Sequence, residues 1–441
     1  MKNVNKWVIV RSANKFYQIF TNMPKFIITG GKKLSGEIVT SGAKNNAQIM
    51  LPVSLLSTET ITLRNLPRID GVEKSLELLA DLGANIEDNG SEIKINTAKI
   101  TKTELDKKIA DKFRTSIMFV GPLLARYGEA KFPHPGGCII GAAGRPIDLF
   151  LEGFAALGAK VEIKDNYYQI SAKKLSGAEI FFTKITVTGT QCLIMTACLA
   201  NGKTILKNCA MEPEIEALAS YLNQQGAKIS GAGTPTIIIE GVEKLNAGES
   251  EIIPDRIEAG SFALMAAATN SEIKITHCNP EHLLNLLTIF NKIGVKYEKG
   301  ADWIEMKKSD KIRPYDMKTH EYPGFSSDLQ SPYVVLMTQA NGTALIQETI
   351  YDRRLIWTDM LSQMGASIIM CDPHRVVISG PTKLYAKKLI SPDIRAGIAL
   401  VIAALIAEGT TEIDNIYQID RGYEKLDERL RNLGADIRRV D

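Results

Sequence analysis

The chain has 441 residues, of which 45% are hydrophobic and 23% are charged, and its formal net charge is +3. This balance is typical of a folded globular protein with two or more domains, and it excludes a disordered or fibrous chain. The net charge by itself indicates neither a nucleic-acid nor a membrane partner, and no apolar run reaches the roughly 18 residues that span a bilayer.

The first 22 residues form a basic segment with Lys2, Lys6, Arg11 and Lys15 and no acidic residue. Their apolar run "WVIV" is far too short for the core of a secretory signal. We expect residues 1–22 to be an N-terminal extension that is either disordered or the product of a start codon upstream of a true start at Met23. An organelle transit peptide is the remaining alternative.

One phrase recurs six times at intervals of about 70 residues: an apolar helix face, a glycine, a small residue and the start of a strand. Leucines three or four apart bury one helix face, and a glycine takes the left-handed conformation that ends a helix at little cost. The glycines concerned are Gly83, Gly158, Gly226, Gly294, Gly365 and Gly434. The period predicts an α/β protein of six units, arranged as two domains of three units in which sheets cover helices.

A second phrase, a helix running into a turn and a strand, alternates with the first, as in "ANGKTIL" and "AEGTTEI". Each unit therefore contains two helices, and strands follow both. A two-domain body of this kind has a natural ligand cleft between its halves. Polar residues that interrupt the repeat are the candidates for function.

Two basic residues stand at predicted helix starts in the first third of the chain. In "SGAKNNAQ", small residues precede Lys44 and Asn45, and such a start can hold an anion with backbone N–H groups and the ammonium. The P-loop spacing is absent, and a solvated first-turn lysine is the alternative. Arg114 precedes an almost wholly apolar helix, so its charge should meet either a carboxylate or a ligand anion.

Cys138 lies in the glycine-rich stretch "PHPGGCIIGAAGRPIDL". Arg145 follows closely and could lower the pKa of the thiol, as a reactive cysteine requires. The other five cysteines form no CxxC pair, so we expect inert, reduced thiols in a cytosolic protein.

Acidic residues near helix starts form a third group. Asp328 lies in "SSDLQSP", where it could cap a helix or act as a general base. Further on, three aspartates each precede an arginine closely, which predicts either structural ion pairs or a site for an anionic ligand. These pairs are Asp352 with Arg354, Asp393 with Arg395, and Asp420 with Arg421.

The sequence gives no support to a metal or cofactor site. "HCNPEH" and "CDPH" contain suitable ligand types, but neither has a matching second pair of ligands. No dinucleotide fingerprint or Ser-His-Asp arrangement is evident. We therefore expect neither a metal nor a cofactor.

Taken together, the motifs resemble the UDP-N-acetylglucosamine 1-carboxyvinyltransferase family from about Met23 to Val440. The resemblance rests on "LSGEIVTSGAKNNA", "GPLLARYG", "PGGC" with "RPIDL", "EPEIEAL", "PDRIEAG", "SSDLQ", "DIRAGIAL", "IAEGTTEIDNIYQIDRGYEKL" and "LRNLGADI", which follow the family's order. It implies the enolpyruvyltransferase fold, a two-domain inside-out α/β barrel of six βαβαββ repeats. The expected domains are 23–43 plus 252–441 (domain 1) and 44–251 (domain 2, with the Cys138 loop).

The resemblance also implies a reaction. The enolpyruvyl group of phosphoenolpyruvate would move to the 3′-hydroxyl of UDP-N-acetylglucosamine by addition and elimination of phosphate, the first committed step of bacterial peptidoglycan precursor synthesis. The expected setting is a cytoplasmic enzyme, a target of fosfomycin, with no nucleic-acid or membrane partner. A monomer is the expected state, although nothing in the sequence reports oligomerisation.

Family roles carry over by matching positions. For phosphoenolpyruvate they fall on Lys44, Asn45, Arg114, Arg145, Arg354, Arg395 and Arg421. For the nucleotide sugar they fall on Arg114, Arg145, Pro146, Ile147, Asp148, Leu149, Lys184, Thr186, Val187, Asp328 and Ile350. The catalytic set implied is Cys138 as general acid, Asp328 as candidate base, and Lys44 and Arg421, while Asp393 matches a charge lining the cleft.

The chain departs from the family pattern at several positions. The loop between Cys138 and Arg145 is two residues longer than usual. Phe150 stands where histidine is usual, Asp352 where glutamate is usual, and Thr188 where glycine is common. The longer loop is expected to affect the position of the Cys138 thiol and, through it, the sensitivity to fosfomycin.

Two other functions compete with this interpretation. The first is a 5-enolpyruvylshikimate-3-phosphate synthase on the same fold, against which the "GGC" and "RPIDL" segments argue. The second is a paralogue that binds the nucleotide sugar without turnover, and the altered loop is the only sequence feature that favours it.

Overall fold

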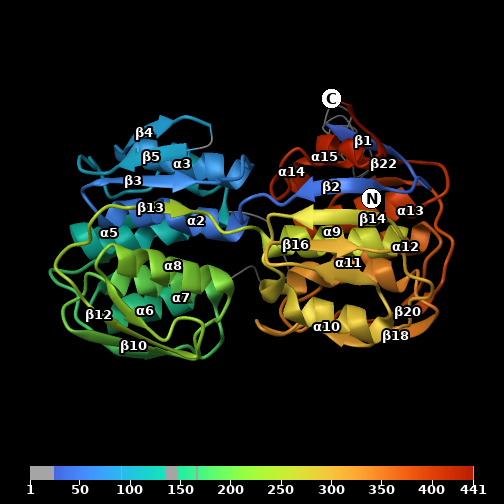
Figure 1. Ribbon diagram of the computed structural model, residues 1–441. Helices are drawn as coiled ribbons and strands as arrows, with labels where there is room; N and C mark the ends of the chain where they lie inside the picture. The colour runs from blue at the N-terminus through green and yellow to red at the C-terminus, as the bar shows by residue number, and fades with distance from the viewer. Residues whose placement is uncertain (1–23, 91, 135–146, 165–166, 441) are drawn as a thin grey trace, which may run out of the picture.

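The computed structural model describes residues 24–90, 92–134, 147–164 and 167–440. These residues form two lobes that lie side by side, each with helices inside and sheets outside (Figure 1). The predicted N-terminal extension, residues 1–22, lies outside the described residues.

Lobe 1 combines the first two strands with the C-terminal half of the chain, so blue strands lie among yellow and red elements in Figure 1. Its helices are α9 (Arg256–Thr269), η3 (Pro280–Leu283), α10 (Leu284–Ile293), α11 (Ser327–Met337), α12 (Thr358–Gln363), α13 (Ile394–Ile406), α14 (Tyr417–Asp420) and α15 (Leu426–Asn432). Its strands are β1 (Lys25–Thr29), β2 (Ser35–Val39), β14 (Glu272–Thr276), β15 (Tyr297–Lys299), β16 (Trp303–Met306), β17 (Met317–Lys318), β18 (Gly342–Gln347), β19 (Ser367–Asp372), β20 (Arg375–Gly380), β21 (Lys388–Ile390), β22 (Thr410–Asp414) and β23 (Asp436–Val440).

Lobe 2 is formed by the chain between these two parts. Its helices are α2 (Lys44–Val53), η1 (Ser54–Leu56), α3 (Asp70–Leu82), α4 (Lys107–Ala110), η2 (Arg114–Phe119), α5 (Val120–Tyr127), α6 (Asp148–Ala156), α7 (Val187–Ala197) and α8 (Pro213–Gln224). Its strands are β3 (Thr60–Arg64), β4 (Asn85–Asp88), β5 (Glu92–Asn96), β6 (Glu129–Pro133), β7 (Lys160–Lys164), β8 (Tyr167–Ser171), β9 (Glu179–Phe181), β10 (Lys203–Lys207), β11 (Lys228–Ser230), β12 (Thr236–Glu240) and β13 (Glu249–Glu251).

The sheets repeat one topology. The described residues form five four-stranded sheets and one three-stranded sheet. In each four-stranded sheet an edge strand pairs in parallel with its neighbour, and the two remaining strands continue antiparallel, as in β2-β14-β16-β15. Inside lobe 1, every residue of α9 is buried, and α9, α11 and α13 pack against one another. A helix that is apolar all round is buried, as the run "AGIALVIAALI" of α13 illustrates.

The six glycines of the repeat adopt the predicted left-handed conformation. Their φ angles lie between +86° at Gly294 and +106° at Gly83. An L-residue with a side chain is strained there, so the six helices share one way of ending.

Alanine at two of these glycines should separate backbone strain from crowding. We expect Gly158→Ala to lower the free energy of unfolding by about 1–2 kcal/mol, because a Cβ there meets nothing within 4 Å and only the left-handed backbone is penalised. Gly83→Ala should cost more, because its Cβ would lie 3.0 Å from the carbonyl oxygen of Lys99. Urea denaturation measures both variants, and a smaller loss for Gly83→Ala would contradict the assignment.

Buried apolar side chains fall into two clusters, one from residues 26–38 and 257–437 and one from residues 47–252. The chain crosses between the lobes twice, and the crossings pair with each other. Ala43 N–H donates to Ile253 O at 2.7 Å, and Asp255 N–H donates to Ser41 O at 2.9 Å. This division supports our proposal that the domain boundaries fall at 43/44 and 251/252.

Among the described residues, no helix is both long and apolar enough to cross a membrane.

Candidate active site

Asp328, one of the predicted site residues, lies between two arginines in lobe 1. Its Oδ1 accepts a hydrogen bond from Arg354 at 2.9 Å, and its Oδ2 accepts one from Arg395 at 2.8 Å. The two guanidinium groups are almost fully buried, whereas 27% of the Asp328 side chain is exposed. The carboxylate is therefore the reachable member of a buried charge cluster.

The two arginines control the charge state of Asp328. Burial alone would raise the pKa of Asp328, but the attraction and hydrogen bonds of Arg395 and Arg354 outweigh burial and hold it well below its ordinary value. Asp328 is therefore ionised near neutral pH. Burial would lower the pKa of Arg395, but Asp328 outweighs this effect and raises it.

The helix starts bring these side chains together. Ser326 caps α11, Asp393 caps α13 and Asp255 caps α9, each by accepting main-chain N–H groups of the first turn. Asp328 and Arg395 thereby occupy the first turns of neighbouring central helices. In both helices a polar N-cap residue stands two positions before the charged site residue, and this pattern can be recognised in the sequence.

Of the two alternatives predicted for the neighbouring aspartates and arginines, the one with an ion pair within each of the three pairs is wrong. Arg354 and Arg395 both bind Asp328, which lies far from them in the sequence. Asp393 caps its helix instead, and Asp420 binds Arg439 through two hydrogen bonds of 2.8 Å. In the Asp393 and Arg395 pair, the aspartate is the N-cap residue and the arginine lies in the first turn of α13, so the aspartate binds main-chain N–H groups instead of the guanidinium.

Arg354 keeps one hydrogen-bond donor unused. Its Nη1 donates to Ser327 Oγ at 2.9 Å and its Nη2 donates to Asp328, but its buried Nε has no partner among the described residues. The guanidinium carbon lies 4.8 Å from the centre of the Tyr351 ring. Such a buried, positive and incompletely satisfied group suits an anionic ligand.

Polar contacts connect the two lobes next to this cluster. Arg256, the first residue of α9, pairs with Glu214 of α8 in lobe 2 at 3.2 Å, and both side chains are buried. Lys44 begins α2 of lobe 2, and its main-chain N–H donates to Asp255 at 3.1 Å. The start of α2 therefore lies beside the start of α9, where the lobes meet.

The remaining predicted residues lie mainly at the starts of other elements. Arg114 begins η2, Asp148 begins α6, Thr186 caps α7 and Val187 begins it. Asn45 follows Lys44 in α2, Ile147 is the N-cap residue of α6, Leu149 is in α6, Lys184 is exposed, and Ile350 and Arg421 are partly buried. Cys138, Arg145 and Pro146 lie outside the described residues.

Several polar residues of the cluster were not among the site residues predicted from the sequence. Ser327 and Glu348 are buried beside Arg354, and the Tyr423 hydroxyl lies 3.4 Å from Arg395 and 3.0 Å from Ser261. Ser327 stands in the quoted motif next to Asp328. Glu348 carries a further signal, because asparagine or histidine directly follows the corresponding strand in four sister sheets.

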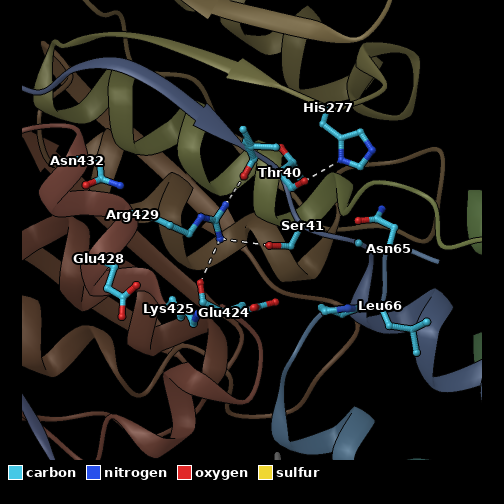
Figure 2. A pocket seen from close by; sticks show the side chains of 13 residues that line it. Thr40, Ser41, Asn65, Leu66, His277, Glu424, Lys425, Glu428, Arg429 and Asn432 are labelled. Carbon is cyan, nitrogen blue, oxygen red and sulfur yellow. Dashed lines mark hydrogen bonds between the residues drawn. The ribbon is translucent and has the colours of Figure 1, made fainter. Parts of the chain in front are cut away.

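A separate cavity of about 620 Å³ lies beside the first crossing between the lobes (Figure 2). Arg429 lines this cavity and forms an ion pair with Glu258. It also donates to Val39 O at 2.6 Å and to Ser41 Oγ at 3.4 Å. None of the predicted site residues that the structure describes lines this cavity. We assign Arg429 to holding the crossing segment rather than to catalysis.

The cysteines outside the Cys138 loop behave as predicted with one exception. Cys192, Cys198, Cys209 and Cys278 are buried, and burial raises the pKa of the first three to about 12 and that of Cys278 to about 11. They are unreactive thiols. Cys371 differs because it is exposed.

Known proteins resemble the chain over nearly its full length. Residues 28–430 match the family model described as EPSP synthase (3-phosphoshikimate 1-carboxyvinyltransferase). The UDP-N-acetylglucosamine 1-carboxyvinyltransferase of Desulfosudis oleivorans is 43% identical over 95% of this chain and 100% of its own length. The enzyme of the same name from Campylobacter hominis is 43% identical over 94% of this chain and 98% of its own.

Solved structures agree on the fold. The enolpyruvyl transferase NikO from Streptomyces tendae matches with a TM-score of 0.85 at 23% identity, covering 95% of this chain and 99% of its own. An EPSP synthase from Acinetobacter baumannii matches with a TM-score of 0.74 at 16% identity, covering 95% and 100%. The predicted enolpyruvyltransferase fold is confirmed. The chain belongs to the family of its relatives named UDP-N-acetylglucosamine 1-carboxyvinyltransferase.

Proposed function

We propose that this protein transfers the enolpyruvyl group of phosphoenolpyruvate to the 3′-hydroxyl of UDP-N-acetylglucosamine. In the addition step the hydroxyl oxygen bonds to C2 of phosphoenolpyruvate while a proton is added to the methylene carbon C3. In the elimination step that carbon loses a proton and phosphate leaves from C2. The identity of 43% over 95% of the chain to relatives of that name carries the proposal.

Phosphoenolpyruvate is a small, highly charged anion, and the proposed site supplies matching cations. Arg395 is buried in the first turn of α13, Arg354 is buried in the turn between β18 and α12, and Lys44 begins α2 where the lobes meet. We propose that these three bind the anion together with Asn45, Arg114, Arg145 and Arg421. Guanidinium forks suit carboxylate and phosphate groups because they donate two parallel hydrogen bonds.

Asp328 is our candidate for the base that takes the proton of the 3′-hydroxyl. Its depressed pKa keeps it ionised but also makes it a weak base while both arginines bind it. An incoming anion would compete for Arg354 and Arg395, which would weaken their hold and raise the basicity of Asp328. Binding of phosphoenolpyruvate would thereby prepare the base for the reaction.

Cys138 is our candidate for the acid that protonates C3, with Lys44 and Arg421 stabilising charge on the reacting group. We propose nucleotide-sugar contacts at Arg114, Arg145, Pro146, Ile147, Asp148, Leu149, Lys184, Thr186, Val187, Asp328 and Ile350. Helix starts at α6 and α7 offer main-chain N–H groups to the diphosphate.

We place the protein in the cytoplasm as a monomer that contributes to peptidoglycan precursor synthesis. Free cysteines at four buried positions suit a reducing compartment. The compartment and the oligomeric state can be examined by fractionation and by analytical ultracentrifugation.

Phosphate release from phosphoenolpyruvate and UDP-N-acetylglucosamine tests the function. We expect release that requires both substrates, and stabilisation of the protein by about 2.7 kcal/mol when UDP-N-acetylglucosamine is present at 100 times its Kd. Shikimate 3-phosphate serves as the control acceptor and should give neither effect. Release with shikimate 3-phosphate alone would favour the synthase, and tight sugar-nucleotide binding without release would favour a non-catalytic paralogue.

A further inference from the structure

Each four-stranded sheet has one parallel pair, formed by an edge strand and its neighbour. The residue that follows the neighbour strand makes the same kind of hydrogen bond in most of these sheets. In four of the five four-stranded sheets of the described chain, its side chain donates to the carbonyl that follows the edge strand. These contacts are Asn65 to Ile252 O at 2.7 Å, Asn208 to Phe182 O at 2.8 Å, His277 to Thr40 O at 2.9 Å, and Asn415 to Ser391 O at 2.9 Å. The bond ties two neighbouring strand ends together.

Glu348 occupies this position in the fifth sheet, after β18. A carboxylate cannot donate to a carbonyl, and the equivalent carbonyl, Thr319 O, instead accepts a hydrogen bond from the hydroxyl of Thr349. Glu348 is 1% exposed. The sheet thus contains a buried carboxyl group where its sisters contain a side-chain donor, and burying such a group is costly unless other groups compensate it.

Four donors satisfy the carboxylate. Oε1 accepts from the main-chain N–H groups of Ile350 at 2.8 Å and Tyr351 at 3.1 Å, and from Thr319 Oγ1 at 3.2 Å. Oε2 accepts from Ser327 Oγ at 2.8 Å. The first two bonds hold the turn that follows β18, and this turn leads to Arg354.

Ser327 links Glu348 to the active-site arginine. Because the Ser327 hydroxyl donates its proton to Glu348, its oxygen is oriented to accept from Arg354 Nη1, which it does at 2.9 Å. Arg354 in turn donates to Asp328. Asp393 and Glu348 also attract the Arg354 guanidinium, so Asp328 is not its only counter-charge.

We infer that Glu348 is a positioning residue of the active site, which orients Arg354 through Ser327 and neutralises part of the arginine charge so that Asp328 remains available to substrate. The inference rests on the proposed function. It explains why a carboxyl group stands here in place of the side-chain donor of the four sister sheets.

Replacing Glu348 by the residue of its sister sheets tests the inference. Glu348→Asn and Glu348→Gln should lower kcat for phosphate release roughly ten- to a hundred-fold, as losses of supporting contacts around active sites commonly do. They should also change the KM for phosphoenolpyruvate more than that for UDP-N-acetylglucosamine, because Arg354 is assigned to the anion. Glu348→Asp keeps the charge and should recover part of kcat.

Asn208→Ala is the matched control, because it removes the same strand tie in a sheet of lobe 2. It should lower the melting temperature without changing kcat or either KM. Wild-type kinetics in both Glu348→Asn and Glu348→Gln would overturn the inference, and so would a kinetic loss equal to that of Asn208→Ala.

Ser327→Ala covers the case in which Glu348 variants do not fold. It removes only the linking hydroxyl and should reproduce the loss of kcat, whereas unchanged kinetics would overturn the inference. If the wild-type protein itself releases no phosphate, the proposed function fails separately. A crystal structure of Glu348→Asn then decides: Arg354 displaced from Asp328 supports the positioning role, and an unmoved Arg354 contradicts it.

Discussion

Asp328→Asn is expected to lower kcat by roughly 10²–10⁴-fold, the usual contribution of a positioned general acid or base. The amide keeps the size of the carboxylate but cannot take the proton of the sugar hydroxyl. Affinity for phosphoenolpyruvate should be retained or increased, because Arg354 and Arg395 lose the carboxylate that competes with the anion. Steady-state kinetics and calorimetric titration measure the two effects.

The same substitution should cost about 1–3 kcal/mol of unfolding free energy. This is less than the loss of a fully buried ion-pair partner, because 27% of the Asp328 side chain is exposed and asparagine still accepts hydrogen bonds. Asp427→Asn is the matched control, since Asp427 also lies between two arginines, Arg431 and Arg439. It should lower stability without lowering kcat, and equal kinetic losses in both variants would show that Asp328 is only structural.

Cys138→Ser is expected to remove most turnover, again by roughly 10²–10⁴-fold, while affinity for UDP-N-acetylglucosamine is kept. A serine hydroxyl is a much weaker acid than a thiol, so it protonates the methylene carbon poorly. Cys138→Asp should retain activity, because a carboxylic acid can donate the same proton. Phosphate release and sugar-nucleotide titration of the two variants measure these outcomes.

The two Cys138 variants separate three roles. A loss of nucleotide-sugar affinity alone would assign Cys138 to structure. Full inactivity of Cys138→Asp would indicate a step that needs the thiol itself. The two additional residues between Cys138 and Arg145 make the comparison informative for this chain, since the spacing sets how the acid reaches its carbon.

Local sequence predicted the scaffold because its rules act over a few residues. The glycines ending the repeat helices all took the left-handed conformation, and apolar periodicity marked the buried helices. The positions of Lys44, Asp328 and Arg395 at helix starts could likewise be recognised, because caps and first-turn residues are neighbours in the chain.

Partner choice within the site could not be predicted in this way. Asp352 and Arg354 are close in sequence, yet Arg354 binds Asp328. The position of Glu348 becomes informative only when the five strand ends are aligned and the hydrogen bonds of its sister residues are known. No local sequence pattern indicates that Arg256 of lobe 1 pairs with Glu214 of lobe 2.

The sequence by itself determined the six-fold repeat, the α/β class, the family and the residue types at the helix starts, because each depends on short-range patterns of apolar, glycine and capping residues. Only the tertiary structure decided which charges meet: Asp328 with Arg354 and Arg395, Ser327 with Glu348, and Arg256 with Glu214. The physical reason is that electrostatic and hydrogen-bond energies fall with distance in space, and tertiary packing brings together residues that are tens of positions apart in the chain.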